Sequence, residues 1–154
     1  MAVAGFRCGT DCVRCVVMDG TRANPAVVES RRLRFPVNLE RPGQLSWLRT
    51  EVLGLLGEAN VAAVCYKKAE AVASRGSGAA ARTEAEAVLQ LAAHEAGVTD
   101  IHGAVKQSLK RALGYDGPAR YIDRAIGEAE IAGVGGSAEE KEAALAAWSC
   151  LPEA

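Results

Sequence analysis

A β-hairpin signal near the start of the chain constrains the fold more than any other feature. Residues 3–20 (VAGFRCGTDCVRCVVMDG) contain two apolar segments joined by a Gly-Thr turn, and the second segment ends at Asp19-Gly20. Apolar segments separated by a short turn that contains glycine are typical of adjacent antiparallel strands. The sequence therefore predicts that this part of the chain forms a hairpin in a β-sheet.

Other patterns place the remaining elements. Alternation predicts a third strand over residues 26–37, and short apolar runs predict strands at 61–66 and within 98–105. A helix is expected from Pro42 to near Gly57. The remaining helices are expected over residues 79–95, 107–113, 120–131 and 137–148. This order predicts an α/β fold in which a mixed five-stranded sheet is flanked by helices.

The size and composition are typical of a globular protein. The chain has 154 residues, 49% hydrophobic and 24% charged, so we expect a single domain over residues 1–154. The net charge of −1 provides no overall field that would attract nucleic acid or a membrane. The charges are uneven, because residues 1–36 carry six Arg and three acids whereas the last thirty carry six Glu and one Lys. Such clusters indicate either a binding face or only solvated surface.

The expected location is the cytoplasm, with no membrane partner. The sequence shows no basic segment followed by an apolar run at its start, and no apolar run of the roughly 20 residues that a membrane-spanning helix needs. Five cysteines, an odd number, argue against a disulfide framework and fit a reducing compartment.

Three of the cysteines have a spacing that could suggest a metal cluster. Cys8, Cys12 and Cys15 follow the C-x3-C-x2-C pattern of iron–sulfur sites in radical SAM enzymes. Cys12 and Cys15 are three residues apart on a predicted strand, so they should face opposite sides of the sheet, and we interpret all three as small core residues. The other cysteines and the histidines show no spacing typical of a second pair of zinc ligands. These residues are Cys65, His94, His102 and Cys150.

The hairpin also resembles the first hairpin of RNase H-like nucleases, most closely the RuvC-like branch. That family has the pattern apolar-Gly-apolar-Asp-x-Gly-Thr, and its Asp holds the catalytic divalent metal. Arg7 occupies the matching position here. The resemblance covers about residues 2–151 and implies an RNase H-like fold with a degenerate active site.

The other acidic positions of the family are also altered or displaced. A Glu follows the central buried strand in the family, whereas Lys67-Lys68 follows it here and Glu70 comes later. The C-terminal helix of the family carries an Asp-x-x-Asp-Ala-type motif, which Glu139 and Glu142 resemble. These two residues share a helix face and could bind Mg²⁺, or they could only stabilise the start of the helix.

A basic stretch, residues 109–120 (LKRALGYDGPAR), resembles a RuvC-like segment whose basic side chains contact DNA phosphates. The resemblance implies phosphate contacts at Lys110, Arg111 and Arg120. A simpler interpretation is an amphipathic helix with a solvated basic face.

The leading hypothesis is a catalytically degenerate RuvC-like protein, a pseudo-nuclease that binds DNA or RNA or acts as a subunit of a larger assembly. Its phosphate contacts would be Arg7, Lys67, Lys68, Lys110, Arg111 and Arg120, with no cofactor. One alternative is a divergent nuclease that uses Mg²⁺ or Mn²⁺. Its catalytic residues would be Asp11, Glu70, Glu139 and Glu142. The other alternative is a homodimeric scaffold without nucleic acid. Whether the chain is an enzyme stays open, with the balance against catalysis.

Overall fold

The structure is a computed structural model that describes residues 1–70, 78–115, 134 and 136–153. The strands are β1 (Val3–Cys8), β2 (Cys12–Gly20), β3 (Pro25–Arg34), β4 (Ala63–Lys67) and β5 (Asp100–Ala104). The helices in these ranges are α1 (Arg41–Ala59), α2 (Ala79–Glu95), α3 (Lys106–Leu113) and α5 (Ala138–Cys150). The helix predicted over 120–131, and Arg120 with it, lie outside the described residues.

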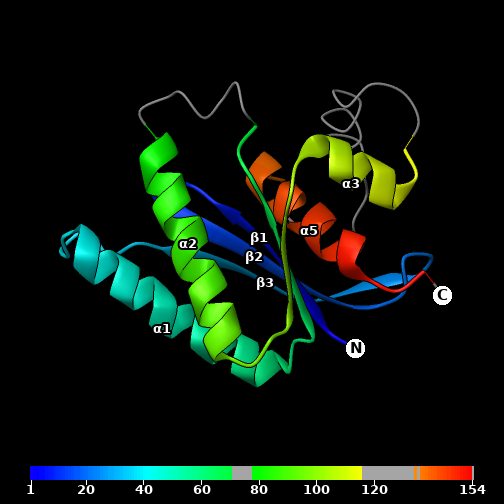
Figure 1. The fold of residues 1–154 in the computed structure, drawn as a ribbon, viewed down its shortest axis with the longest axis horizontal. Coiled ribbons are helices and arrows are strands. Elements are labelled where there is room, and N and C mark those ends of the chain that lie inside the picture. Colours follow the sequence, from blue (N-terminus) through cyan, green and yellow to red (C-terminus); the bar gives the residue numbers. More distant parts are fainter. Residues whose placement is uncertain (71–77, 116–133, 135, 154) are drawn as a thin grey trace.

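The strands form one mixed sheet in the order β3-β2-β1-β4-β5. The hairpin predicted over residues 3–20 is β1 paired antiparallel with β2, and β3 continues the antiparallel part. β1, β4 and β5 run parallel to one another; α1 leads from β3 into β4, and α2 lies in the crossover from β4 to β5. The predicted α/β fold with a five-stranded mixed sheet is confirmed (Figure 1).

Helices cover both faces of the sheet. α1 and α2 pack on one face over a core that contains Ala4 and Phe6 of β1. α5 crosses the other face, where Val3 of β1 lies, and α3 packs beside it (Figure 1). Since successive side chains of a strand point to opposite faces, odd-numbered residues of β1 lie on the α5 face.

α5 approaches β1 unusually closely, and Gly5 permits this approach. A Cβ atom added to Gly5 would lie 2.0 Å from the backbone oxygen of Ala143 and 2.3 Å from the backbone nitrogen of Ala147. Ala143, Ala144, Ala146 and Ala147 are fully buried, and Ala143 and Ala147 are the residues that meet Gly5, so α5 presents small side chains where it crosses β1. The glycine and the alanines together let the helix backbone rest on the strand.

The third strand ends earlier than the predicted residue 37. β3 ends at Arg34, and Pro36 and the 95% exposed Val37 lie beyond it. Proline has no N–H to donate to a sheet, so strand pairing stops before Pro36. The alternation of apolar and polar residues in the sequence continues to residue 37 and therefore does not show where the strand ends. Among the described residues, no helix combines the length and hydrophobicity needed to cross a lipid bilayer.

Candidate functional site

Three arginines form a row across the antiparallel part of the sheet. Arg7 of β1 is the register partner of Arg14 of β2, and Arg14 is the register partner of Arg32 of β3. Directly opposed residues of neighbouring strands project on the same face, here the face that α5 covers. Like charges opposed in this way destabilise a sheet. A row of three cations therefore needs a compensating partner.

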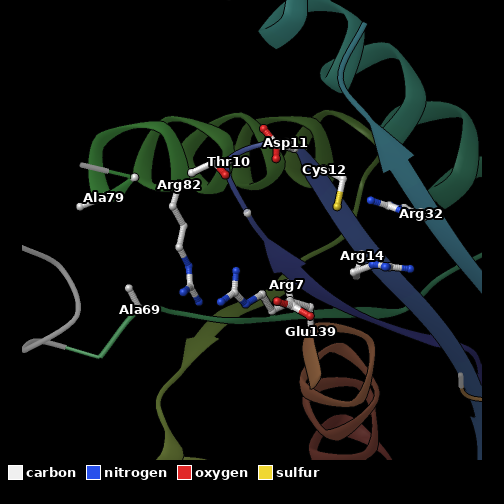
Figure 2. A pocket seen from close by; sticks show the side chains of 12 residues that line it. Arg7, Thr10, Asp11, Cys12, Arg14, Arg32, Ala69, Ala79, Arg82 and Glu139 are labelled. Atoms are coloured by element: carbon white, nitrogen blue, oxygen red, sulfur yellow. The ribbon is translucent and has the colours of Figure 1, made fainter. Parts of the chain in front are cut away.

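The arginine row lines a cavity of about 410 Å³ at the end of β1. Arg82 of α2 also lines it, so four of the described guanidinium groups border one space. Figure 2 shows the side chains of Arg7 and Arg82 reaching toward one another, with Arg14 and Arg32 on the neighbouring strands. Among the residues that the structure describes, Asp11 and Glu139 are the acids that line the cavity, and both are exposed.

Arg7 is held in place by two contacts. Its Nη1 donates a hydrogen bond to the backbone oxygen of Cys8 at 2.8 Å, and its Nε lies 3.4 Å from Oε2 of Glu142. The side chains of Arg7 and Glu142 are 20% and 17% exposed, so this ion pair is only partly screened by solvent. Arg14 differs, because its Nε is buried and has no hydrogen-bond partner among the residues that the structure describes.

Arg82 is fixed by α2 and by the end of β4. Its Nε pairs with Glu86 at 3.2 Å, and its Nη2 donates to the backbone oxygen of Lys67 at 2.7 Å. The side chains of Arg82 and Glu86 are each 13% exposed. These contacts fix the Arg82 guanidinium at the border of the cavity.

Lys67 is buried and satisfied by its own neighbourhood. Its Nζ donates to Glu70 at 2.9 Å and to the backbone oxygen of Lys68 at 2.6 Å, and the residue is 2% exposed. Partial burial acts to raise the pKa of Glu70. Hydrogen bonds from the backbone N–H of Lys106 and from the ammonium of Lys67 outweigh this effect, so the Glu70 pKa lies below its ordinary value.

The carboxylates of the described residues do not form the ligand set that a metal-dependent nuclease requires. Glu142 is paired with Arg7, and Glu70 is paired with Lys67. Within the described ranges, no three carboxylates converge closely enough to share an ion. A two-metal centre needs several such oxygens to offset its charge, and four guanidiniums would oppose it. These residues therefore do not fit a Mg²⁺ or Mn²⁺ centre.

The other basic residues predicted as contacts that the structure describes do not line the cavity. Lys68 is exposed just after β4, while Lys110 and Arg111 lie in the last turn of α3. Cations in the last turn of a helix also interact favourably with its dipole. The structure therefore does not bring these three residues together with Arg7.

The cysteines of the C-x3-C-x2-C pattern do not converge. Cys8 and Cys15 are buried in the core beneath α1 and α2, and burial raises the pKa of both thiols. Cys12 lies on the opposite face of the sheet and lines the cavity. The expectation that Cys12 and Cys15 face opposite sides is confirmed.

Sequence reasoning missed Arg14, Arg32 and Arg82 as members of this site. Identifying Arg14 required the observed register, because the hairpin is centred between Thr10 and Asp11, whereas a hairpin centred on the Gly9-Thr10 turn would place residue 12 opposite residue 7. Arg32 required the register of the β2–β3 pair, which contains an irregularity between Val17 and Met18. Predicting Arg82 as a site residue required knowledge of how α2 packs beside the end of β4, and no local sequence pattern indicates this packing.

The order of the strands and the helices on both faces define an RNase H-like fold of the RuvC-like type. The structure of Thermus thermophilus RuvC is similar to this chain with a TM-score of 0.76 and 17% identity, over 97% of this chain and 92% of that one. RuvC from the same organism in complex with a Holliday junction substrate gives a TM-score of 0.73 and 19% identity, with 97% and 91% covered. The yeast mitochondrial Holliday junction resolvase Ydc2 gives 0.60 and 11% identity, with 96% and 76% covered.

Comparisons of sequence alone find no such likeness. No protein-family model matches the chain, and no curated protein matches it. At identities below 20%, the structural likeness establishes the fold.

Proposed function

We propose that this chain is a catalytically degenerate RuvC-like protein that binds nucleic acid without cleaving it. Phosphate groups of DNA or RNA would enter the cavity that the arginine row lines. The observation that carries the proposal is the direct register of Arg7, Arg14 and Arg32 on three neighbouring strands.

A polyanion would resolve the electrostatic conflict within this row. Guanidinium groups bind phosphate oxygens in pairs of parallel, charge-assisted hydrogen bonds. The buried Nε of Arg14 lacks an acceptor among the described residues, and a phosphate could supply one. Because the net charge of the chain is −1, this attraction would act locally at the cavity rather than over long distances.

The proposal assigns different roles to the predicted basic residues. Arg7, together with Arg14, Arg32 and Arg82, would contact phosphates directly. Lys67 would instead support the fold, because its ammonium is buried against Glu70. The exposed residues Lys68 and Arg111, with the half-buried Lys110, would extend the contact outside the cavity, and Arg120 stays a prediction from the sequence.

The part of the proposal that excludes cleavage rests on the same charges. The carboxylates that could bind a metal are paired with cations or exposed at the edge of the cavity. Arginine at position 7 would meet a phosphate directly, where the family pattern uses a metal-bound acid.

Fluorescence anisotropy with labelled duplex, single-stranded and four-way-junction DNA and with RNA, at two salt concentrations and with Mg²⁺, tests the proposal. We expect binding that weakens steeply with salt, because phosphate contacts release counterions. The double variant Arg14→Ala/Arg32→Ala should lose most of this binding. Arg49→Ala is the matched control, since Arg49 lies on α1 and pairs with Glu95 at the far end of α2 from Arg82.

Two results would overturn the proposal. Cleavage of the same DNA in a gel, lost in a Glu139→Gln/Glu142→Gln variant, would support a divergent metal-dependent nuclease. No binding to any nucleic acid at low salt would leave a role in a protein assembly, and a mass that rises with concentration in light scattering would support a homodimer.

A further inference from the structure

A second cluster of reactive side chains lies far from the arginine row. Cys65 of β4 is the register partner of His102 of β5, so both side chains project on the α5 face. Cys150, the last residue of α5, lies over this pair. Glu139 and Cys150 lie at opposite ends of α5, which separates the cluster from the cavity by roughly 17 Å along the helix axis.

The ligand atoms of these three residues are spaced as a metal site requires. The two sulfur atoms and one histidine nitrogen lie within 4.8 Å of one another. Sγ of Cys150 is 3.6 Å from Nε2 of His102. In a tetrahedral zinc site with Zn–S of about 2.3 Å and Zn–N of about 2.0–2.1 Å, sulfur and nitrogen are separated by about 3.6 Å.

A carboxylate orients the histidine for this role. Nδ1 of His102 lies 3.4 Å from Oδ1 of Asp100, which leaves Nε2 directed at Cys150. Metal-binding histidines almost always donate their second ring N–H to such a partner, which fixes the tautomer and the ring plane. Asp100 and His102 are two residues apart on β5, so the strand itself holds this arrangement.

The surroundings also suit a bound ion. Cys65 is fully buried, with the hydroxyl of Ser149 3.8 Å from its sulfur, whereas the His102 side chain is 48% exposed. One side of the cluster is thus enclosed and the other is open to solvent, which provides a path for entry and space for a water molecule. Sulfur and imidazole ligands favour zinc over Mg²⁺ or Ca²⁺.

We propose that Cys65, His102 and Cys150 bind one Zn²⁺ ion, with a water molecule as the fourth ligand. The ion would join the end of α5 to β4 and β5 and would stabilise the packing of this helix on the sheet. This inference is independent of nucleic-acid binding.

Zinc titration of the metal-free, reduced full chain, in competition with a chromophoric chelator, tests this proposal. We expect one Zn²⁺ per chain, a rise in Tm on zinc addition, and a thiolate-to-metal charge-transfer band when Co²⁺ replaces zinc. His102→Gln and Cys150→Ser should abolish the stoichiometric binding, and Asp100→Asn should weaken it by roughly 10- to 100-fold. His94→Gln and Cys12→Ser are the matched controls and should bind as the unmodified chain does.

His102→Gln keeps the test informative even if Cys150→Ser fails to fold, because the His102 side chain is half-exposed. Zinc binding that is equal in His102→Gln and the unmodified chain would overturn the proposal. So would the absence of stoichiometric zinc in the reduced protein. A Cys65–Cys150 disulfide that forms despite saturating zinc would overturn it as well.

Discussion

Nε of Arg7 lies 3.4 Å from Oε2 of Glu142, a contact that spans 135 residues of sequence. It joins a cation of the first strand to an acid of the last described helix, at the border of the cavity. Glu142 therefore acts as an internal counterion, and a bound phosphate would compete with it for Arg7.

We predict that Glu142→Gln tightens nucleic-acid binding. The substitution removes the negative charge beside Arg7 and keeps the shape of the side chain. The expected gain is about 0.5–1 kcal/mol, or roughly two- to fivefold in Kd. Anisotropy measures it, with Glu51→Gln on α1 as the charge-matched control. Weaker binding in Glu142→Gln would contradict the competition between Glu142 and phosphate.

We predict that the salt dependence of binding reports the number of arginine contacts. Each lost phosphate contact should reduce the slope of log Kobs against log salt by about 0.9 on duplex DNA. Arg14→Ala and Arg32→Ala should each show this reduction and should weaken binding to all sequences alike, since phosphate contacts carry no sequence information. An unchanged slope in both variants, matching that of Arg49→Ala, would place the bound nucleic acid elsewhere.

We predict that the Lys67–Glu70 pair makes stability depend on acid pH. The pKa of Glu70 lies below its ordinary value of 4.5, so the pair stabilises the fold above the unfolded-state pKa and loses this contribution as pH falls through the folded-state pKa. Urea unfolding should show Glu70→Gln less stable at pH 7 by on the order of 1 kcal/mol. The difference should shrink as the pH falls below about 4.5.

Glu58→Gln is the control for this experiment. Glu58 pairs with Arg31 at the surface, and its side chain is 71% exposed. We expect almost no effect on unfolding at any pH. A constant difference between Glu70→Gln and the unmodified chain from pH 7 to pH 3 would show that Glu70 contributes by packing and not by charge.

We predict that Gly5→Ala strongly destabilises the fold. The new Cβ would lie 2.0 Å from the backbone oxygen of Ala143, so α5 must move off the sheet. Overpacking of this kind costs about 3 kcal/mol or more, because backbone atoms cannot rotate away. In contrast, Gly54→Ala and Gly57→Ala on the exposed face of α1 meet no atom within 4 Å and should stabilise the helix by about 0.5–1 kcal/mol each.

The fold was largely predictable because its signals are local. The hairpin over residues 3–20 has a short turn between two apolar segments, and the run at Val61–Tyr66 has the continuous hydrophobicity of a strand buried on both faces. The structure contains both predicted features, the hairpin as β1 and β2 and the buried strand as β4. The predicted end of the third strand, residue 37, was three residues too late, because the alternation of apolar and polar residues does not indicate where strand pairing stops.

The candidate sites were less predictable because they depend on pairing between elements. Arg7 was identified from its position in the hairpin, but its partners Arg14 and Arg32 become neighbours only through the register of three strands. The Cys65–His102–Cys150 cluster has no sequence spacing typical of zinc sites, since 48 residues separate His102 from Cys150. It arises from the parallel pairing of β4 with β5 and the position of the end of α5.

The contact of Gly5 with Ala143 and Ala147 also has a consequence for biosynthesis. The hairpin that contains Gly5 is translated early, yet the helix that covers its second face is translated well over a hundred residues later. Until α5 leaves the ribosome, the apolar side chains of Val3, Val16 and Met18 have no cover. This face of the sheet is therefore the surface that nascent chains would present to chaperones, and contacts so distant in sequence favour slow folding.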